Sequence, residues 1–145
     1  MSELNRQDAK IAKIFQETNE ELDELARLVI GAAIEVHRVL GAGFLESVYE
    51  EALCLELSTR GIHYLRQPII AVEYKGQHVG EGRLDILVEN QLIVELKAVE
   101  FLAPIHTAQV LSYLKTTGYQ LGLLINFNVP MLKQGLKRVA LNKHL

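Results

Sequence analysis

The chain has 145 residues, of which 49% are hydrophobic, and its formal net charge is −3. This length and apolar content predict one domain of ordinary size with a real hydrophobic core. The single cysteine, Cys54, excludes an intrachain disulfide and favours a reducing compartment. No apolar run approaches the ~20 residues that a membrane-spanning helix needs, and the N-terminal segment carries Glu3 and Asp8 instead of an apolar leader. We therefore expect a soluble, cytoplasmic protein with no membrane partner.

The charge is distributed unevenly along the chain. Residues 1–60 hold twelve acids and six lysines or arginines, whereas residues 101–145 hold five basic residues and no acid. A basic face could attract a polyanion in spite of the negative total, because the local field steers a ligand. The same residues could instead pair with the acidic N-terminal helices. The pattern leaves both possibilities open for Lys115, Lys133, Lys137, Arg138 and Lys143.

The chain is expected to begin with helices. Residues 1–19 are polar with scattered apolar positions, which predicts a helical or frayed N-terminal extension, and residues 20–145 are expected to form a single domain. Apolar residues recur every three or four positions over residues 20–40, which indicates an amphipathic helix. A second helix is predicted over residues 45–60, with Gly61 as its C-terminal cap.

The middle of the chain changes to strand patterns. Residues 62–74 favour a strand in which Pro68 marks an edge or a bulge, and a turn leads into a second strand over residues 78–89. The third strand, over residues 92–98, is almost continuously apolar, which is typical of a central strand covered on both faces.

The last third returns to a helix and then to strands. Pro104 suits the first turn of a helix that ends at Gly118, and residues 121–127 predict another strand. Residues 136–141 fit a strand or a short helix, and we favour the strand. Together the elements predict an α/β fold in which helices flank a mixed central sheet.

Three ionisable residues stand out among the apolar strands. If residues 85–97 form a hairpin centred on Asn90, Asp85 faces Glu95, and Lys97 lies on the same face as Glu95. Two close carboxylates repel each other unless a cation lies between them. The spacing alone is a weak signal that also fits surface ion pairs, but the apolar surroundings favour a Mg2+ site for phosphodiester hydrolysis.

Several ordered motifs resemble the PD-(D/E)xK nuclease superfamily, and within it the GxxExxY family. The family name is spelled by Gly43-Phe44-Leu45-Glu46-Ser47-Val48-Tyr49. The similarity continues through Arg83-Leu84-Asp85, Val94-Glu95-Leu96-Lys97-Ala98 and residues 104–114, and it covers about residues 22–141. Leu84 stands where the superfamily has its proline, a residue that is not a ligand.

The resemblance implies a restriction-endonuclease-like core and specific roles. Asp85 and Glu95 match the metal-binding acids, Lys97 the catalytic lysine, and Glu46 the acid from the first core helix. With the Leu96 carbonyl, these oxygens suit Mg2+ or Mn2+, since such ions prefer hard oxygen ligands.

Three further residues are candidates for contact with the nucleic acid. Gln109 and Tyr113 lie one helical turn apart and match a Gln-x-x-x-Tyr element of the superfamily. His106 could contact substrate or serve a structural role, and packing is the favoured role for Gly43 and Tyr49.

Two hypotheses for function follow. The first is a Mg2+-dependent nuclease that acts on nucleic acid, with DNA as the favoured substrate. The second is a non-catalytic module that binds nucleic acid or protein and retains the nuclease fold. The short, acidic chain also favours a homo-oligomer or a protein partner that supplies additional DNA-binding surface.

Overall fold

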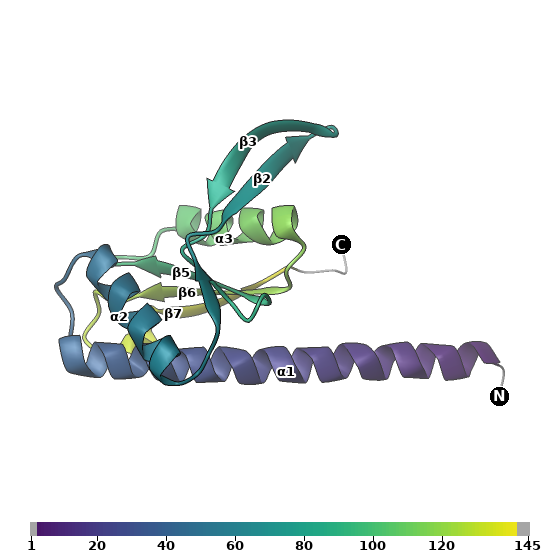
Figure 1. The fold of residues 1–145 in the computed structure, drawn as a ribbon, viewed down its shortest axis with the longest axis horizontal. Helices are drawn as coiled ribbons and strands as arrows, with labels where there is room; N and C mark the ends of the chain where they lie inside the picture. The colour runs from purple at the N-terminus through teal and green to yellow at the C-terminus, as the bar shows by residue number, and fades with distance from the viewer. Residues whose placement is uncertain (1–2, 142–145) are drawn as a thin grey trace.

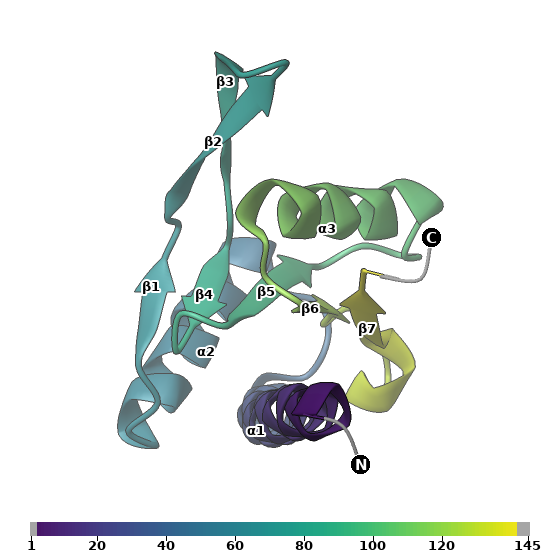
Figure 2. The same ribbon diagram turned by 90° about the vertical axis from the view of Figure 1, so that its right-hand side faces the viewer.

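A mixed five-stranded sheet forms the centre of the molecule. The computed structural model describes the backbone of residues 3–141 and the side chains of residues 20–141. The strand order is β1-β4-β5-β6-β7, and β2 and β3 form a separate two-stranded ribbon. Helices α1 and α2 pack on one face of the sheet and α3 on the other, while the ribbon projects away from the body (Figures 1 and 2). This is the predicted α/β architecture.

The two N-terminal helices are α1 (Glu3–Leu40) and α2 (Glu46–Thr59). The second agrees with the predicted helix to within one residue at each end. Helix α1 is longer than its predicted amphipathic part, because the helical backbone continues through residues 3–19. The proposed boundary between an extension and a domain at residue 19 therefore lies inside one helix, and it stays a prediction.

The remaining helices and strands follow in chain order. They are β1 (Tyr64–Arg66), β2 (Ile69–Tyr74), β3 (Gln77–Arg83), β4 (Ile86–Val88), β5 (Leu92–Lys97), α3 (Pro104–Thr117), β6 (Leu121–Asn126), the 3-10 helix η1 (Leu132–Gly135) and β7 (Leu136–Ala140).

Two predicted strands are each broken in two. The strand expected over residues 62–74 divides into β1 and β2, because Gln67 adopts a left-handed φ of 55° and Pro68 has no backbone N–H to donate. The strand expected over residues 78–89 breaks at residues 84–85. The two halves next to the turn, β2 and β3, pair with each other as the ribbon, whereas β1 and β4 pair within the main sheet.

The β4–β5 hairpin has the predicted register. Ile86 faces Val94 and Val88 faces Leu92, so the hairpin is centred on residue 90 as expected. Glu89 and Asn90 have φ values of 50° and 59°, as a tight turn of the mirror-image type requires.

The crossover to the parallel strand β6 is also as predicted. Pro104 occupies the first turn of α3, and Gly118 ends the helix with a left-handed φ of 82°. The last segment is the favoured strand, β7, which pairs antiparallel to β6.

Two apolar cores lie on the two faces of the sheet. Strand β5 is buried on both, as its sequence indicated: Val94 and Leu96 pack with α1 and α2, whereas Ile93 packs with α3. Cys54 is a free, buried thiol, and burial raises its pKa to about 11. Within the described residues, no helix combines the length and the hydropathy that a membrane crossing requires.

Candidate active site

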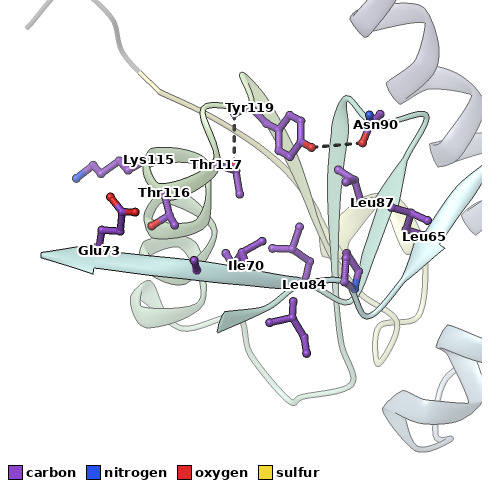
Figure 3. Close-up of a pocket in the computed structure, with 13 residues that line it drawn as sticks. Leu65, Ile70, Glu73, Leu84, Leu87, Asn90, Lys115, Thr116, Thr117 and Tyr119 are labelled. Atoms are coloured by element: carbon purple, nitrogen blue, oxygen red, sulfur yellow. Dashed lines mark hydrogen bonds between the residues drawn. The ribbon is translucent and has the colours of Figure 1, made fainter. Parts of the chain in front are cut away.

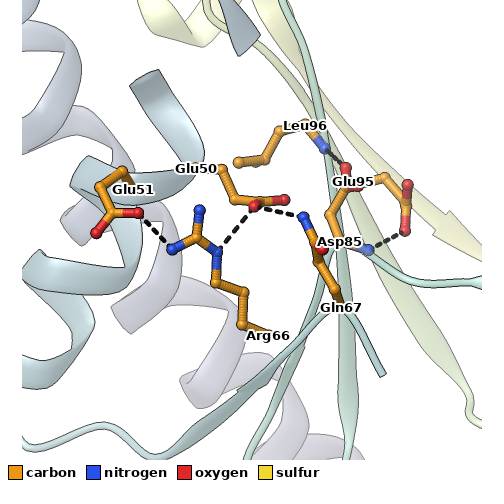
Figure 4. A network of polar contacts seen from close by, with 7 residues as sticks. All are labelled: Glu50, Glu51, Arg66, Gln67, Asp85, Glu95 and Leu96. Atoms are coloured by element: carbon orange, nitrogen blue, oxygen red, sulfur yellow. Dashed lines mark hydrogen bonds and ion pairs between the residues drawn. The ribbon is translucent and has the colours of Figure 1, made fainter. Parts of the chain in front are cut away.

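Asp85 and Glu95 hold each other in place through their backbones. The backbone N–H of Asp85 donates to Oε1 of Glu95 at 2.9 Å, and the N–H of Leu96 donates to Oδ2 of Asp85 at 2.8 Å (Figure 4). Asp85 lies just before β4 and Glu95 within β5, so the hairpin register brings the two carboxylates together. The two side chains also hydrogen-bond each other, which requires a proton between them when no metal is bound.

The electrostatics of this pair are unfavourable without a cation or a proton. Glu95 is only 3% exposed, and this burial together with the charge of Asp85 raises the pKa of Glu95 to about 8. Burial also raises the pKa of Asp85, although its hydrogen bond from Leu96 opposes that rise. In the absence of a metal, the pair therefore holds a proton near neutral pH.

Lys97 and Glu46 belong to the same group of charges. The positive charge of Lys97 lowers the pKa values of Asp85, Glu95 and Glu46, which places its ammonium near all three carboxylates. Glu46 lies at the exposed start of α2, where desolvation and then the charge of Asp85 raise its pKa. The structure thus brings together all four residues predicted as catalytic.

Helix α3 brings Tyr113 and Gln109 to this site. Burial and then the charges of Glu95 and Asp85 raise the pKa of the Tyr113 phenol, so its ring lies near the acids. Nε2 of Gln109 donates to the Tyr113 hydroxyl at 3.2 Å.

His106 has a structural contact instead. Its Nδ1 accepts a hydrogen bond from the Ala103 N–H at 3.0 Å, which fixes the ring at the start of α3. A capping box also needs a polar side chain at the N-cap position. Ala103 has none, so only this one of the two capping-box hydrogen bonds can form. Nε2 has no partner among residues 20–141, so a contact with substrate stays a prediction.

The connection between α1 and α2 is held by Tyr49. Its hydroxyl donates to the Gly41 carbonyl at 2.6 Å and accepts from the Phe44 N–H at 3.2 Å, and its ring stacks on Phe127. Gly43 has a φ of 110°, which side chains rarely adopt. These contacts support the packing roles favoured for Tyr49 and Gly43.

Sequence reasoning missed Glu50, Arg66 and Gln67. Glu50 is 6% exposed, and its Oε2 accepts from Arg66 Nε at 2.9 Å and from Gln67 Nε2 at 3.0 Å (Figure 4). Glu50 follows Glu46 by one helical turn, so the sequence alone could have predicted that the two acids lie on the same face of the helix. The other two had no such signal, because they lie 16 and 17 residues from Glu50 in the sequence.

The oxygen donors fit a hard divalent cation. Asp85 and Glu95 offer adjacent carboxylate oxygens, and Mg2+ is usually held by one or two carboxylates plus water and substrate phosphate. As the side chains stand within residues 20–141, no group of three or more His, Cys, Asp or Glu residues is arranged to hold a metal ion. The hairpin therefore offers a pair of carboxylates rather than a closed cage of ligands.

A cavity of about 840 Å³ lies elsewhere on the molecule. It is bounded by β2, the last turn of α3 and the β4–β5 turn, and Tyr119 donates to Asn90 at 3.4 Å beside it (Figure 3). Its lining contains none of the carboxylates of the site, so it offers no oxygen cluster for a metal.

The C-terminal basic residues do not gather on one element. Arg138 pairs with Asp23 of α1 at 2.6 Å, and the lysines at 115, 133 and 137 lie on α3, η1 and β7. The Arg138 contact fits the alternative in which these residues pair with the acidic N-terminal helices. Lys143 lies outside the described residues.

Comparison with known proteins gives one family. A sequence model of the PD-(D/E)XK nuclease superfamily matches residues 23–139. The chain has no significant match among curated proteins and none among solved structures. The matched range includes every residue of the candidate site, and the mixed sheet flanked by helices agrees with a restriction-endonuclease-like fold.

Proposed function

Since the chain belongs to the PD-(D/E)XK nuclease superfamily, we propose that it is a Mg2+-dependent nuclease that hydrolyses phosphodiester bonds, with DNA as its substrate. The observation that carries this proposal is the convergence of Asp85, Glu95 and Lys97 at the open end of one hairpin. The motif at residues 43–49 supports a finer assignment to the GxxExxY family.

The residues of the site divide the work of hydrolysis. Bound Mg2+ would supply an acidified water and a positive charge against the phosphate oxygens. Asp85 and Glu95 would hold the ion with carboxylate oxygens in place of the proton they share, together with the Leu96 carbonyl and Glu46 on the α2 side. Mn2+ would fit the same oxygen ligands.

Lys97 and helix α3 would act on the substrate. The Lys97 ammonium would orient the attacking water or stabilise charge on the pentacovalent phosphorus. The Gln109 amide and the Tyr113 hydroxyl, already hydrogen-bonded to each other, would position the nucleic-acid strand, and His106 Nε2 would contact it at the start of α3.

A thermal-shift experiment tests the cation site. Mg2+ or Mn2+ should raise the melting temperature of the wild type by mass action, and Asp85→Asn should abolish most of that rise. Glu81→Gln, on the exposed ribbon, is a matched control that should respond like the wild type. An equal response of the wild type and Asp85→Asn would refute the site.

A digestion panel tests the reaction. Single-stranded, double-stranded and branched DNA and RNA are incubated with Mn2+ and either the wild type or Lys97→Ala. We expect cleavage of DNA by the wild type alone. Cleavage that persists with Lys97→Ala would trace to a contaminant.

A non-catalytic binding module is the second candidate. It is favoured by one observation, namely that the described side chains form no ready group of three metal ligands. This candidate predicts nucleic-acid binding that is the same with EDTA and with Mn2+, and no product in the digestion panel.

The cellular setting is part of the proposal. The free, buried Cys54 suits a reducing cytoplasm. Exposed apolar side chains at the start of α2, such as Leu45 at 76%, suit a protein partner or a second copy that adds binding surface.

A further inference from the structure

Arg83 differs from every other arginine whose side chain the structure describes. All the others form an ion pair with an aspartate or a glutamate; they are Arg27, Arg38, Arg60, Arg66 and Arg138. Arg83 is exposed, and within residues 20–141 it forms no ion pair, not even with Glu81 two positions earlier on β3. Its guanidinium is therefore available to a negatively charged ligand.

Arg83 lies beside the acids of the candidate site. It is the last residue of β3, two positions before Asp85, where the chain leaves the ribbon and enters the main sheet. The preceding residue, Gly82, approaches α3 so closely that a Cβ there would lie 3.2 Å from the ring of Tyr113. The base of the ribbon is thus packed against the part of α3 that reaches the site.

The charges of Arg83 and of the acids act on the same phenol. Glu95 and Asp85 raise the pKa of the Tyr113 hydroxyl, and Arg83 lowers it. The same hydroxyl accepts a hydrogen bond from Gln109 at 3.2 Å. The Tyr113 phenol therefore marks the place where the ribbon, α3 and the β4–β5 hairpin meet.

Two other cations near the acids are already engaged. The charge of Lys97 acts on the carboxylates of the site, and Arg66 forms ion pairs with Glu50 and Glu51. A nucleic acid brings a phosphate charge at every nucleotide, and a protein holds it by placing cations against these phosphates. At this place, Arg83 is a cation that no carboxylate of the described chain offsets.

We propose that Arg83 binds a backbone phosphate of the nucleic acid at the side of the site where the ribbon begins. A guanidinium presents its N–H donors in a planar fork that fits two phosphate oxygens. This contact leads the strand from the base of the ribbon, past Tyr113, to the acids. Arg83 is a substrate-binding residue, and the inference rests on the proposed function because it concerns the same substrate.

The salt dependence of DNA binding by the full chain tests this contact. Fluorescence anisotropy of a labelled DNA oligonucleotide is measured with Mn2+ in the Lys97→Ala background, so that binding is observed without cleavage. Adding Arg83→Ala should weaken binding roughly tenfold or more, as the loss of a hydrogen-bonded ion pair does. It should also make the slope of log affinity against log salt shallower by about one, the share of one phosphate contact.

Two further variants are compared in the same background. Arg83→Lys keeps the charge and loses the planar fork, so it should keep the salt slope and recover only part of the affinity. Arg27→Ala is the matched control, because Arg27 is also exposed but lies on α1, on the other face of the sheet. It should change neither the affinity nor the salt slope.

The outcomes separate this inference from the proposed function. If Arg83→Ala leaves the affinity and the salt slope unchanged, the inference is wrong, while the digestion panel and the thermal shift of Asp85→Asn still decide the proposed function. A loss of affinity in Arg83→Ala at an unchanged slope would also overturn the inference, because a structural role removes no phosphate contact.

Two remaining results are also decisive. If Arg83→Ala fails to fold, Arg83→Lys carries the test: a weaker affinity at an unchanged slope supports the phosphate contact, and an unchanged affinity overturns it. If DNA binds neither to the wild type in EDTA nor to Lys97→Ala in Mn2+, this inference and the proposed function are both wrong.

Discussion

Glu95→Gln should stabilise the metal-free protein at alkaline pH. The pKa of Glu95 is raised from 4.5 to about 8, so the folded state holds its proton where the unfolded chain has released it. The folded state then binds more protons between pH 4.5 and 8, and the stability of the wild type falls as pH rises through that window. Glutamine stays neutral and avoids this loss.

The magnitude follows from the pKa rise. Each pKa unit corresponds to about 1.4 kcal/mol, so the rise from 4.5 to about 8 sets an upper bound on the order of 5 kcal/mol. Asp85, Lys97 and Tyr113 face the same carboxylate, and Asp85 shares the proton with it. We therefore expect the free energy of unfolding of Glu95→Gln to exceed that of the wild type by roughly 2–5 kcal/mol at pH 9 and to match it near pH 5.

Urea denaturation in EDTA at pH 5, 7 and 9 measures this difference. Other groups titrate in both proteins, so the difference between the wild type and Glu95→Gln isolates Glu95. Glu81→Gln, exposed on β3, should follow the wild type at every pH. A stability difference between the wild type and Glu95→Gln that does not change between pH 5 and 9 would refute the reasoning.

Three further predictions use other parts of the structure. The Mg2+ affinity of the wild type should rise with pH up to about 8, because the ion displaces the proton of Glu95. Calorimetry in two buffers with different ionisation enthalpies measures the released proton, and an affinity that does not change with pH would contradict this prediction. Tyr49→Phe should lower the free energy of unfolding in urea by roughly 1–3 kcal/mol, because the Tyr49 hydroxyl makes two hydrogen bonds to the α1–α2 loop. An unchanged denaturation midpoint would show that stability does not depend on these hydrogen bonds. Gly135→Ala should lower the free energy of unfolding by roughly 1–3 kcal/mol or more, because a Cβ would lie 2.1 Å from the Asn126 carbonyl oxygen. A melting temperature equal to that of the wild type would contradict this prediction.

The sequence by itself determined the local features near the site. The turn at Asn90 set the hairpin register, and the alternation of side chains between the two faces of a strand then placed Glu95 and Lys97 on one face. Pro104 and Gly118 marked the ends of α3 through backbone preferences that act within a few residues. The closeness of Asp85, Glu95 and Lys97 followed from these local rules.

Only the tertiary structure decided what joins that hairpin from elsewhere. The breaks at Gln67 and at residues 84–85 separate the ribbon from the main sheet. Pro68 marked an edge or a bulge beside the first break, but the strand propensities around residues 84–85 gave no sign of the second. The packing of α2 against β1 and β5 brings Glu50 beside Asp85. Its anchors, Arg66 and Gln67, are distant in sequence, and such contacts depend on how whole elements pack rather than on any local pattern.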